Sequence, residues 1–129
     1  MIAGVQAALV AALKAEPEIV SLRAGVFDGP PPGARYPYLA IAETAAAGWG
    51  AKGLPGRELR LAVTAWDDAG PARLHALMAA AERGIEAIAR EGAGWRIASL
   101  AFLRSRVVRD ADGPWAGLVE YRVRVVATE

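Results

Sequence analysis

His75 is the single histidine of the sequence and the first residue to consider for acid–base chemistry. A catalytic histidine needs a second group that orients its ring, and a metal site needs further ligands nearby. His75 follows Leu74 on a predicted helix, off the apolar stripe, and no carboxylate stands at a suitable helical spacing. We therefore expect a solvent-exposed histidine with no catalytic or metal-binding role.

Two pairs of aspartates offer carboxylates for acid–base chemistry or for Mg²⁺. Asp67 and Asp68 precede Pro71, where a helix is predicted to begin, and aspartate is a common helix cap. Asp110 and Asp112 belong to a predicted turn, in which aspartate is also common. Capping and turn formation account for both pairs better than catalysis does.

The glycine-rich segment GWGAKG, residues 48–53, resembles a phosphate-binding loop only in composition. A P-loop requires the spacing G-x-x-x-x-G-K-[ST] and a helix directly after it, and both are missing. The sequence also has no cysteine, which excludes thiolate chemistry. We therefore predict no enzyme activity, no cofactor and no metal.

The composition is typical of one globular domain spanning residues 1–129. Of these residues 54% are hydrophobic, but no continuous run approaches the ~20 apolar residues that a membrane span needs. Fifteen basic and 14 acidic residues give a net charge of +1, too little for a non-specific nucleic-acid binder overall. The N-terminal segment lacks the basic start of a secretory signal, so we expect no export.

Hydrophobic spacing predicts two helices that would support any functional surface. The first covers residues 2–15, with an apolar stripe at Ile2, Val5, Leu9 and Leu13, and ends before Pro17. The second runs from Pro71 to about Arg90, and one short helical turn is expected near Ile19. A loop is predicted after Gly25, because three consecutive prolines follow.

Alternating apolar and polar residues predict strands in YPYLAIAET (36–44) and ELRLAVTAW (58–66). The segment Ala45–Gly56 between them holds four glycines and one proline and is longer than a usual hairpin loop, so a functional or disordered loop is expected there. The C-terminal third predicts a long β-hairpin with a turn at Ala111–Gly113. Its expected cross-strand pairs are Arg109 with Trp115, Arg104 with Glu120, and Leu103 with Tyr121.

This order of elements predicts an α+β fold: a mostly antiparallel sheet of about four strands packed against two helices, with the long C-terminal β-hairpin. One face of the hairpin is apolar and suited to lie against the helices: Ala101, Leu103, Val107, Val119, Tyr121, Val123 and Val125. The other face is rich in arginine: Arg104, Arg106, Glu120, Arg122 and Arg124. A slip of one residue would exchange these faces, so the pattern defines the register.

The hairpin strands are predicted to be more than twice the usual length of five or six residues. We expect Ser105–Gly117 to project from the body, with Arg109 stacked on an exposed Trp115. Such an arm, together with the predicted loop, indicates a partner-binding surface. Its candidate residues are Trp49, Lys52, Leu54, Arg104, Arg106, Arg109, Trp115, Glu120 and Arg122. Alternatives are a nucleic-acid-binding module that uses the arginine-rich face, or a small enzyme with a polar pocket.

These features resemble a family of small siphophage tail-completion proteins, also found in prophages and gene transfer agents, that includes tail terminators and tail-to-head joining proteins. The resemblance covers nearly the whole chain. It rests on the alanine-rich first helix, YPY at Tyr36–Tyr38, a strand ending in Trp66, a helix after DDAGP, and the final RDADGPWAG and EYRV.

The resemblance implies a structural virion protein without catalytic residues. It implies a ring, expected to be sixfold, seated on the major tail protein and joined to the head-tail connector or stopper protein. DNA would pass through the lumen without sequence-specific binding, and no membrane would be involved. The expected location is the tail-head junction of a virion or phage-like particle.

Overall fold

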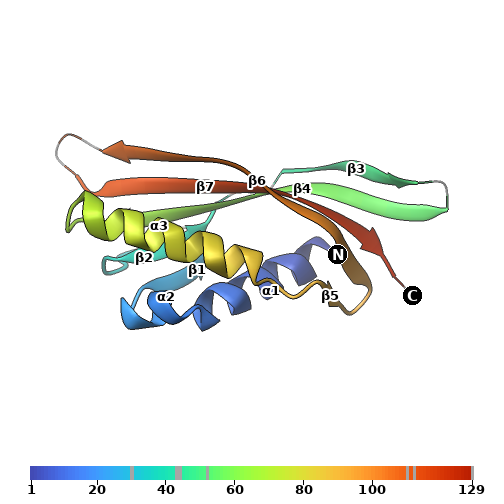
Figure 1. Ribbon diagram of the computed structural model, residues 1–129, viewed down its shortest axis with the longest axis horizontal. Helices are drawn as coiled ribbons and strands as arrows, with labels where there is room; N and C mark the ends of the chain where they lie inside the picture. Colours follow the sequence, from blue (N-terminus) through green and yellow to red (C-terminus); the bar gives the residue numbers. More distant parts are fainter. Residues whose placement is uncertain (30, 43–44, 52, 110, 112, 129) are drawn as a thin grey trace.

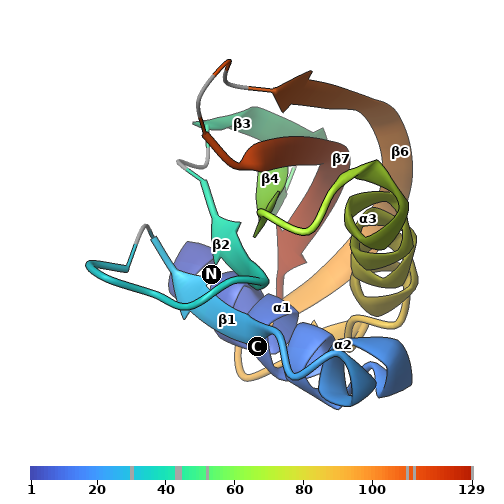
Figure 2. The same cartoon turned by 90° about the vertical axis from the view of Figure 1, so that its left-hand side faces the viewer.

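The structure is a computed structural model that describes the chain apart from residues 30, 43–44, 52, 110, 112 and 129. The described residues form three helices and a seven-stranded sheet, and the helices all lie on one face of that sheet (Figure 1). Seen from the side, the sheet curls over the helices (Figure 2). The α+β class is confirmed, but the sheet has more than the four expected strands and a third helix is present.

The helices begin where the sequence predicts. Helix α1 spans Ile2–Ala15, α2 spans Pro17–Ser21 and α3 spans Pro71–Glu86, four residues short of the predicted end. Their apolar stripes are buried, including Val5, Leu9 and Leu13 of α1. Gly84 of α3 lies so close to α1 that an added Cβ would come within 2.9 Å of the Leu13 side chain, which shows how tightly the two helices pack.

The strands are β1 (Gly25–Asp28), β2 (Tyr38–Ile41), β3 (Ala45–Ala51), β4 (Leu54–Asp67), β5 (Glu91–Gly92), β6 (Trp95–Arg109) and β7 (Trp115–Ala127). Their order in the sheet is β1-β2-β4-β7-β6-β5, and β3 pairs with β4 beyond the end of β2. The β1–β2 pair is parallel and the other pairs are antiparallel, so the prediction of a mostly antiparallel sheet is confirmed.

Two segments predicted as loops are strands. Residues Gly25–Asp28 form β1, which is too short for its alternation to be recognised and is held by parallel pairing with β2. The predicted loop Ala45–Gly56 is a hairpin, because β3 pairs with β4 from Ala45 opposite Arg60 to Ala51 opposite Leu54. Glycine and proline disfavour strands intrinsically, but pairing with a long neighbouring strand outweighs that preference here.

This hairpin, formed by β3 and the Leu54–Arg60 part of β4, is called the β3–β4 arm below. It extends away from the helices at one end of the molecule (Figure 1). In β3 the residues Ala45–Gly48 are exposed whichever face of the sheet they point to. The arm, rather than the C-terminal hairpin, is therefore the part that projects.

The C-terminal hairpin is integrated into the sheet, contrary to the prediction that its far end projects. Strand β7 pairs with β4 along its whole length, as far as Asp67 opposite Trp115. Trp115 is half-buried against the core, and Gly117 lies directly beneath the Met78 side chain of α3. The sequence could not show this, because alternation within one strand does not reveal its partner, and here the C-terminal end of β4, Ala65–Asp67, pairs with Trp115–Gly117.

The predicted register of this hairpin is right near its turn and wrong farther along. Arg109 lies opposite Trp115 and Arg104 opposite Glu120, as expected. A β-bulge between Phe102 and Arg104 then shifts the pairing, so that Phe102 rather than Leu103 lies opposite Tyr121. One extra residue in a strand reverses the faces beyond it, and Ala101 consequently shares the arginine-rich face instead of the helix-covered face.

Candidate interaction surface

The face of the sheet away from the helices, called the outer face here, carries a cluster of ion pairs. Alternation along β4 places Leu59, Leu61 and Val63 in the core and turns their neighbours outward. Pairing of β4 with β7, and of β7 with β6, then brings charged side chains from three strands together. They are Glu58 and Arg60 from β4, Arg104 from β6, and Glu120, Arg122 and Arg124 from β7.

Each glutamate in this cluster bridges two arginines. Glu120 accepts a hydrogen bond from Arg104 at 3.3 Å and another from Arg60 at 3.4 Å. Glu58 accepts one from Arg124 at 3.0 Å, and its Oε1 lies 3.9 Å from Nε of Arg122.

The two pairs made by Glu120 are too exposed on their arginine side to contribute much to stability. The Arg60 and Arg104 side chains are 53% and 65% exposed, and surface pairs of this kind contribute roughly 0 to 1 kcal/mol each. The cluster therefore matters for what it presents at the surface, which is a set of oriented guanidinium groups with the glutamates held between them.

An aromatic cluster occupies the outer face at the β1–β2 side. Tyr38 stacks on Tyr36 and on Trp66, with ring centroids 5.7 and 6.4 Å apart, and meets Phe27 edge to face at 6.0 Å. Burial, and secondarily the neighbouring Tyr36, raise the pKa of Tyr38, so its hydroxyl stays protonated. The described helices lie on the other face of the sheet, away from these rings. Sequence reasoning missed the cluster because it forms only when β1, β2 and β4 pair.

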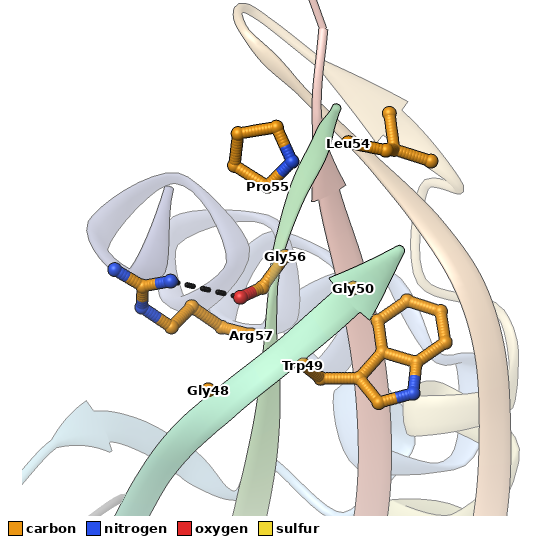
Figure 3. Close-up of a pocket in the computed structure, with 7 residues that line it drawn as sticks. All are labelled: Gly48, Trp49, Gly50, Leu54, Pro55, Gly56 and Arg57. Atoms are coloured by element: carbon orange, nitrogen blue, oxygen red, sulfur yellow. Dashed lines mark hydrogen bonds between the residues drawn. The ribbon is translucent and has the colours of Figure 1, made fainter. Parts of the chain in front are cut away.

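The β3–β4 arm adds an apolar tip to the same outer face. Figure 3 shows Trp49 and Leu54 on one side of the arm and Pro55 and Arg57 on the other. The Arg124 guanidinium lies 5.4 Å from the Trp49 ring centroid, which connects the tip to the ion pairs. Leu54 is 41% exposed. These side chains and the glycines Gly48, Gly50 and Gly56 line a shallow, open depression at the tip (Figure 3).

Arg109 and Trp115 form the predicted cross-strand stack, with the guanidinium 5.0 Å from the indole centroid. They do not belong to the outer face. Register places Trp115 on the helix-covered face, where it packs against the core while Arg109 remains exposed. The prediction of an exposed Trp115 is therefore wrong, because the core extends under the end of the hairpin.

The predicted interface residues thus separate into groups. Arg104, Arg106, Glu120 and Arg122 share the outer face with Trp49 and Leu54, whereas Arg109 and Trp115 lie at the hairpin end on the other side. Lys52 lies outside the described residues. Sequence reasoning missed Glu58 and Arg60, which complete the ion pairs. The alternation of apolar and polar residues along β4 is the signal that could have identified them.

The carboxylates considered for catalysis have structural roles where the structure describes them. Asp67 is fully buried and binds the Arg73 guanidinium through two hydrogen bonds of 2.6 Å. The helix cap predicted at Asp67 and Asp68 is instead Gly70, which makes no side-chain capping bond. Asp110 and Asp112 lie outside the described residues. His75 is exposed, as expected.

Glu16 is the second buried carboxylate. It caps α2 by accepting hydrogen bonds from the backbone N–H groups of Glu18 and Ile19, and it binds Arg83 of α3 at 3.1 Å. Within the described part of the chain, no group of three or more His, Cys, Asp or Glu side chains is placed to hold a metal ion. No helix there is long and apolar enough to span a membrane.

Comparison with known proteins identifies the family of the chain that carries this surface. Residues 7–126 match the family model of tail completion protein gp17. No curated protein sequence matches the chain. Among solved structures, a chain from a structure described as the virion of a native gene transfer agent particle superposes with a TM-score of 0.80. It is 26% identical in sequence, and the match covers 96% of both chains.

Proposed function

The chain belongs to the family of tail completion protein gp17, and on that premise we propose that it forms a ring that caps the tail tube and joins the tail to the head. Family membership assigns it to a phage or phage-like particle as a structural component of the tail. The observation that carries the finer proposal is the likeness to a gene transfer agent virion chain over 96% of both molecules.

The form of the molecule supports a subunit that is completed by neighbours. An uncovered sheet face bearing aromatic rings and oriented arginines, together with an arm exposed on both sides, is an arrangement that soluble monomers normally avoid. Head-to-tail contacts between copies close a ring when the rotation between them is a whole fraction of a turn. We propose six copies.

In this proposal the ring has three kinds of neighbour. Copies of the chain contact one another around the ring, the major tail protein lies on one side, and the head-tail connector or stopper protein lies on the other. DNA passes through the lumen without sequence-specific contacts. The outer-face arginines are largely paired with Glu58 and Glu120, which reduces their attraction for phosphate.

The test is to delete the gene in the strain that makes the particles and to examine the products by electron microscopy. Unjoined heads and tails, or tails of uncontrolled length, are expected, and the wild-type gene should restore normal particles. A gold-labelled tag on the chain should mark the head-proximal end of the tail, with six copies by quantitative mass spectrometry. Normal particles from the deletion strain, or a label elsewhere in the particle, would contradict the proposal.

The alternative, a nucleic-acid-binding module, has one observation in its favour: the outer face carries more arginines than glutamates. Binding through that face would depend steeply on salt, because each phosphate contact releases counterions. Titration of duplex DNA at two salt concentrations separates the hypotheses. Micromolar affinity that falls steeply with salt supports the alternative, whereas negligible binding at physiological salt supports the structural role.

A further inference from the structure

Strand β3 leaves one edge of the sheet open. Among the described strands it pairs with β4 alone, so its other side presents unpaired backbone N–H and C=O groups. Its sequence from Ala45 to Ala51, AAAGWGA, contains no charge, no proline and no β-bulge. Natural proteins usually protect an edge by such devices, so an unprotected edge is a place where another strand adds.

Strand β6 leaves a second open edge on the opposite side of the sheet. Strand β5 covers only its first residues, with Glu91 opposite Arg96 and Gly92 opposite Trp95. From Ser99 to Arg109 no described strand pairs with the side of β6 away from β7. Most side chains from Arg104 to Arg109 are exposed, so this edge is accessible from both faces.

We propose that these two edges pair with each other between copies, the β3 edge of one chain adding to the β6 edge of the next. This inference rests on the proposed ring and names its subunit contact. The sheets of neighbouring copies become continuous, and the β3 and β6 edges of each copy are paired. Backbone hydrogen bonds then hold the subunits together, as in other cases of strand addition.

Strand direction favours this pairing. Strands β3, β4, β7 and β6 alternate in direction across the sheet, since each neighbouring pair is antiparallel. A second copy placed beside the first in the same orientation therefore brings its β3 antiparallel to β6. The open edges lie toward opposite ends of the molecule, so the copies are staggered, and a closed ring accommodates such a stagger by tilting its strands.

Charge selects the β3–β6 combination over self-pairing of β6. Two β6 edges placed together would bring Arg104 and Arg106 of both copies onto one small area, and like charges across strands are destabilising. Strand β3 carries no charge, so it places no like charge opposite the arginines of β6. Its outward residues Ala45 and Ala47 are also small, which leaves room for the long side chains of Arg104 and Arg106.

Cysteine cross-linking tests the contact directly, because the natural chain has no cysteine. Ala47→Cys is combined in turn with Arg104→Cys, Arg106→Cys and Val108→Cys, which all point to the outer face and sample three registers. Each double variant is produced in the deletion strain, and particles are purified and mildly oxidised. The matched control joins Ala46→Cys, which points to the opposite face, with Val108→Cys.

At least one outer-face pair should give a ladder of linked chains that ends at the ring size, whereas the control pair and every single variant should stay monomeric on denaturing gels. Dimers from Ala47→Cys alone would overturn the proposal, because they mean that two β3 edges meet. Absence of any ladder in joined particles that contain the chain would also overturn it, and the proposed function would stand. If the chain is missing from joined particles, the proposed subunit contact and the proposed function both fail.

Discussion

At the scale of single residues, buried ion pairs rather than catalytic groups explain the conspicuous carboxylates. Asp67 closes the end of β4 onto the first turn of α3, and Glu16 joins α1, α2 and α3 through Arg83. For Asp67, burial raises the pKa, but the Arg73 guanidinium and the Ala69 N–H outweigh it and lower the pKa. Glu16 behaves in the same way with Ile19 N–H and Arg83.

Lowered carboxyl pKa values predict loss of stability in acid. A carboxylate whose pKa is lower in the folded state than in the unfolded state stabilises the fold at any pH above its unfolded pKa. This contribution is lost as the pH falls through its folded pKa. The melting temperature should therefore fall between about pH 5 and pH 2. The substitution Asp67→Asn should lower the free energy of unfolding at pH 7 by about 1–3 kcal/mol, because Arg73 loses a charged hydrogen-bond partner, and the melting temperature should depend less on pH.

Asp68→Asn is the control for this prediction, because its side chain is 63% exposed and lies 3.9 Å from Arg73. It should melt within about a degree of the wild type at pH 7. Thermal unfolding followed by circular dichroism from pH 7 to pH 2 measures both variants. Equal effects of the two substitutions would show that burial of Asp67 is not the source of the stabilisation.

Two tryptophans lie beside arginines, and we predict that they contribute differently to the free energy of unfolding. Trp115 packs against the core, whereas Trp49 lies on the β3–β4 arm. Trp115→Ala should lower the free energy of unfolding by about 2–4 kcal/mol, because a half-buried indole is lost. Trp49→Ala should cost under about 1 kcal/mol but reduce particle joining. Urea unfolding of both variants measures the two losses of unfolding free energy. A larger loss for Trp49→Ala than for Trp115→Ala would contradict the packing of Trp115 against the core.

At the scale of elements, the β3–β4 arm depends on close backbone approach. A Cβ on Gly56 would collide with the carbonyl oxygen of Trp49 and lie 2.9 Å from that of Val125. Both neighbours are backbone atoms in paired strands, so neither can move without disturbing the pairing. Gly56 is therefore needed where β3, β4 and β7 come together, whereas Gly48 has nothing within 4 Å of the added atom.

Gly56→Ala is predicted to loosen the arm and Gly48→Ala to leave it intact. The first should cost about 1–3 kcal/mol through overpacking. The second should be neutral or slightly stabilising, because it reduces the freedom of the unfolded chain. Hydrogen exchange of the β3 amides measures the stability of the arm, and thermal unfolding measures the stability of the rest of the domain. Protection of β3 that survives Gly56→Ala would show that the pairing tolerates a side chain there.

At the scale of the whole molecule, the helices and the core they cover lie apart from the surfaces available to partners. The apolar core under β4 and β7 holds the domain together, and the outer face and the β3 and β6 edges remain uncovered (Figure 1). Removal of an edge element should therefore affect assembly far more than folding.

Shortening the arm tests this separation. Replacing Gly48–Arg57 with Asn-Gly keeps Ala47 opposite Glu58 and supplies a tight hairpin turn. The shortened chain should melt within a few degrees of the wild type, because most of the removed side chains are exposed. It should fail to restore joined particles in the deletion strain. Normal particles would show that this part of the arm makes no essential contact.

The sequence by itself determined the properties that depend on local pattern. The stripe at Val5, Leu9 and Leu13 identified α1, Pro71 marked the start of α3, and the Asp110–Gly113 turn defined the pairs Arg109–Trp115 and Arg104–Glu120. Local motifs also carried the family resemblance, which the match over residues 7–126 confirms. These features depend on neighbours a few residues apart, so one sequence suffices to predict them.

Only the tertiary structure decided which surfaces are open. Residues Ala45–Ala51 form a strand because they pair with β4. Trp115 is half-buried against the core because β4 and α3 reach the end of the hairpin. The bulge at Leu103 moved Ala101 to the outer face. Pairing between distant strands depends on the register and length of every strand between them, and alternation within one strand contains no information about its partner.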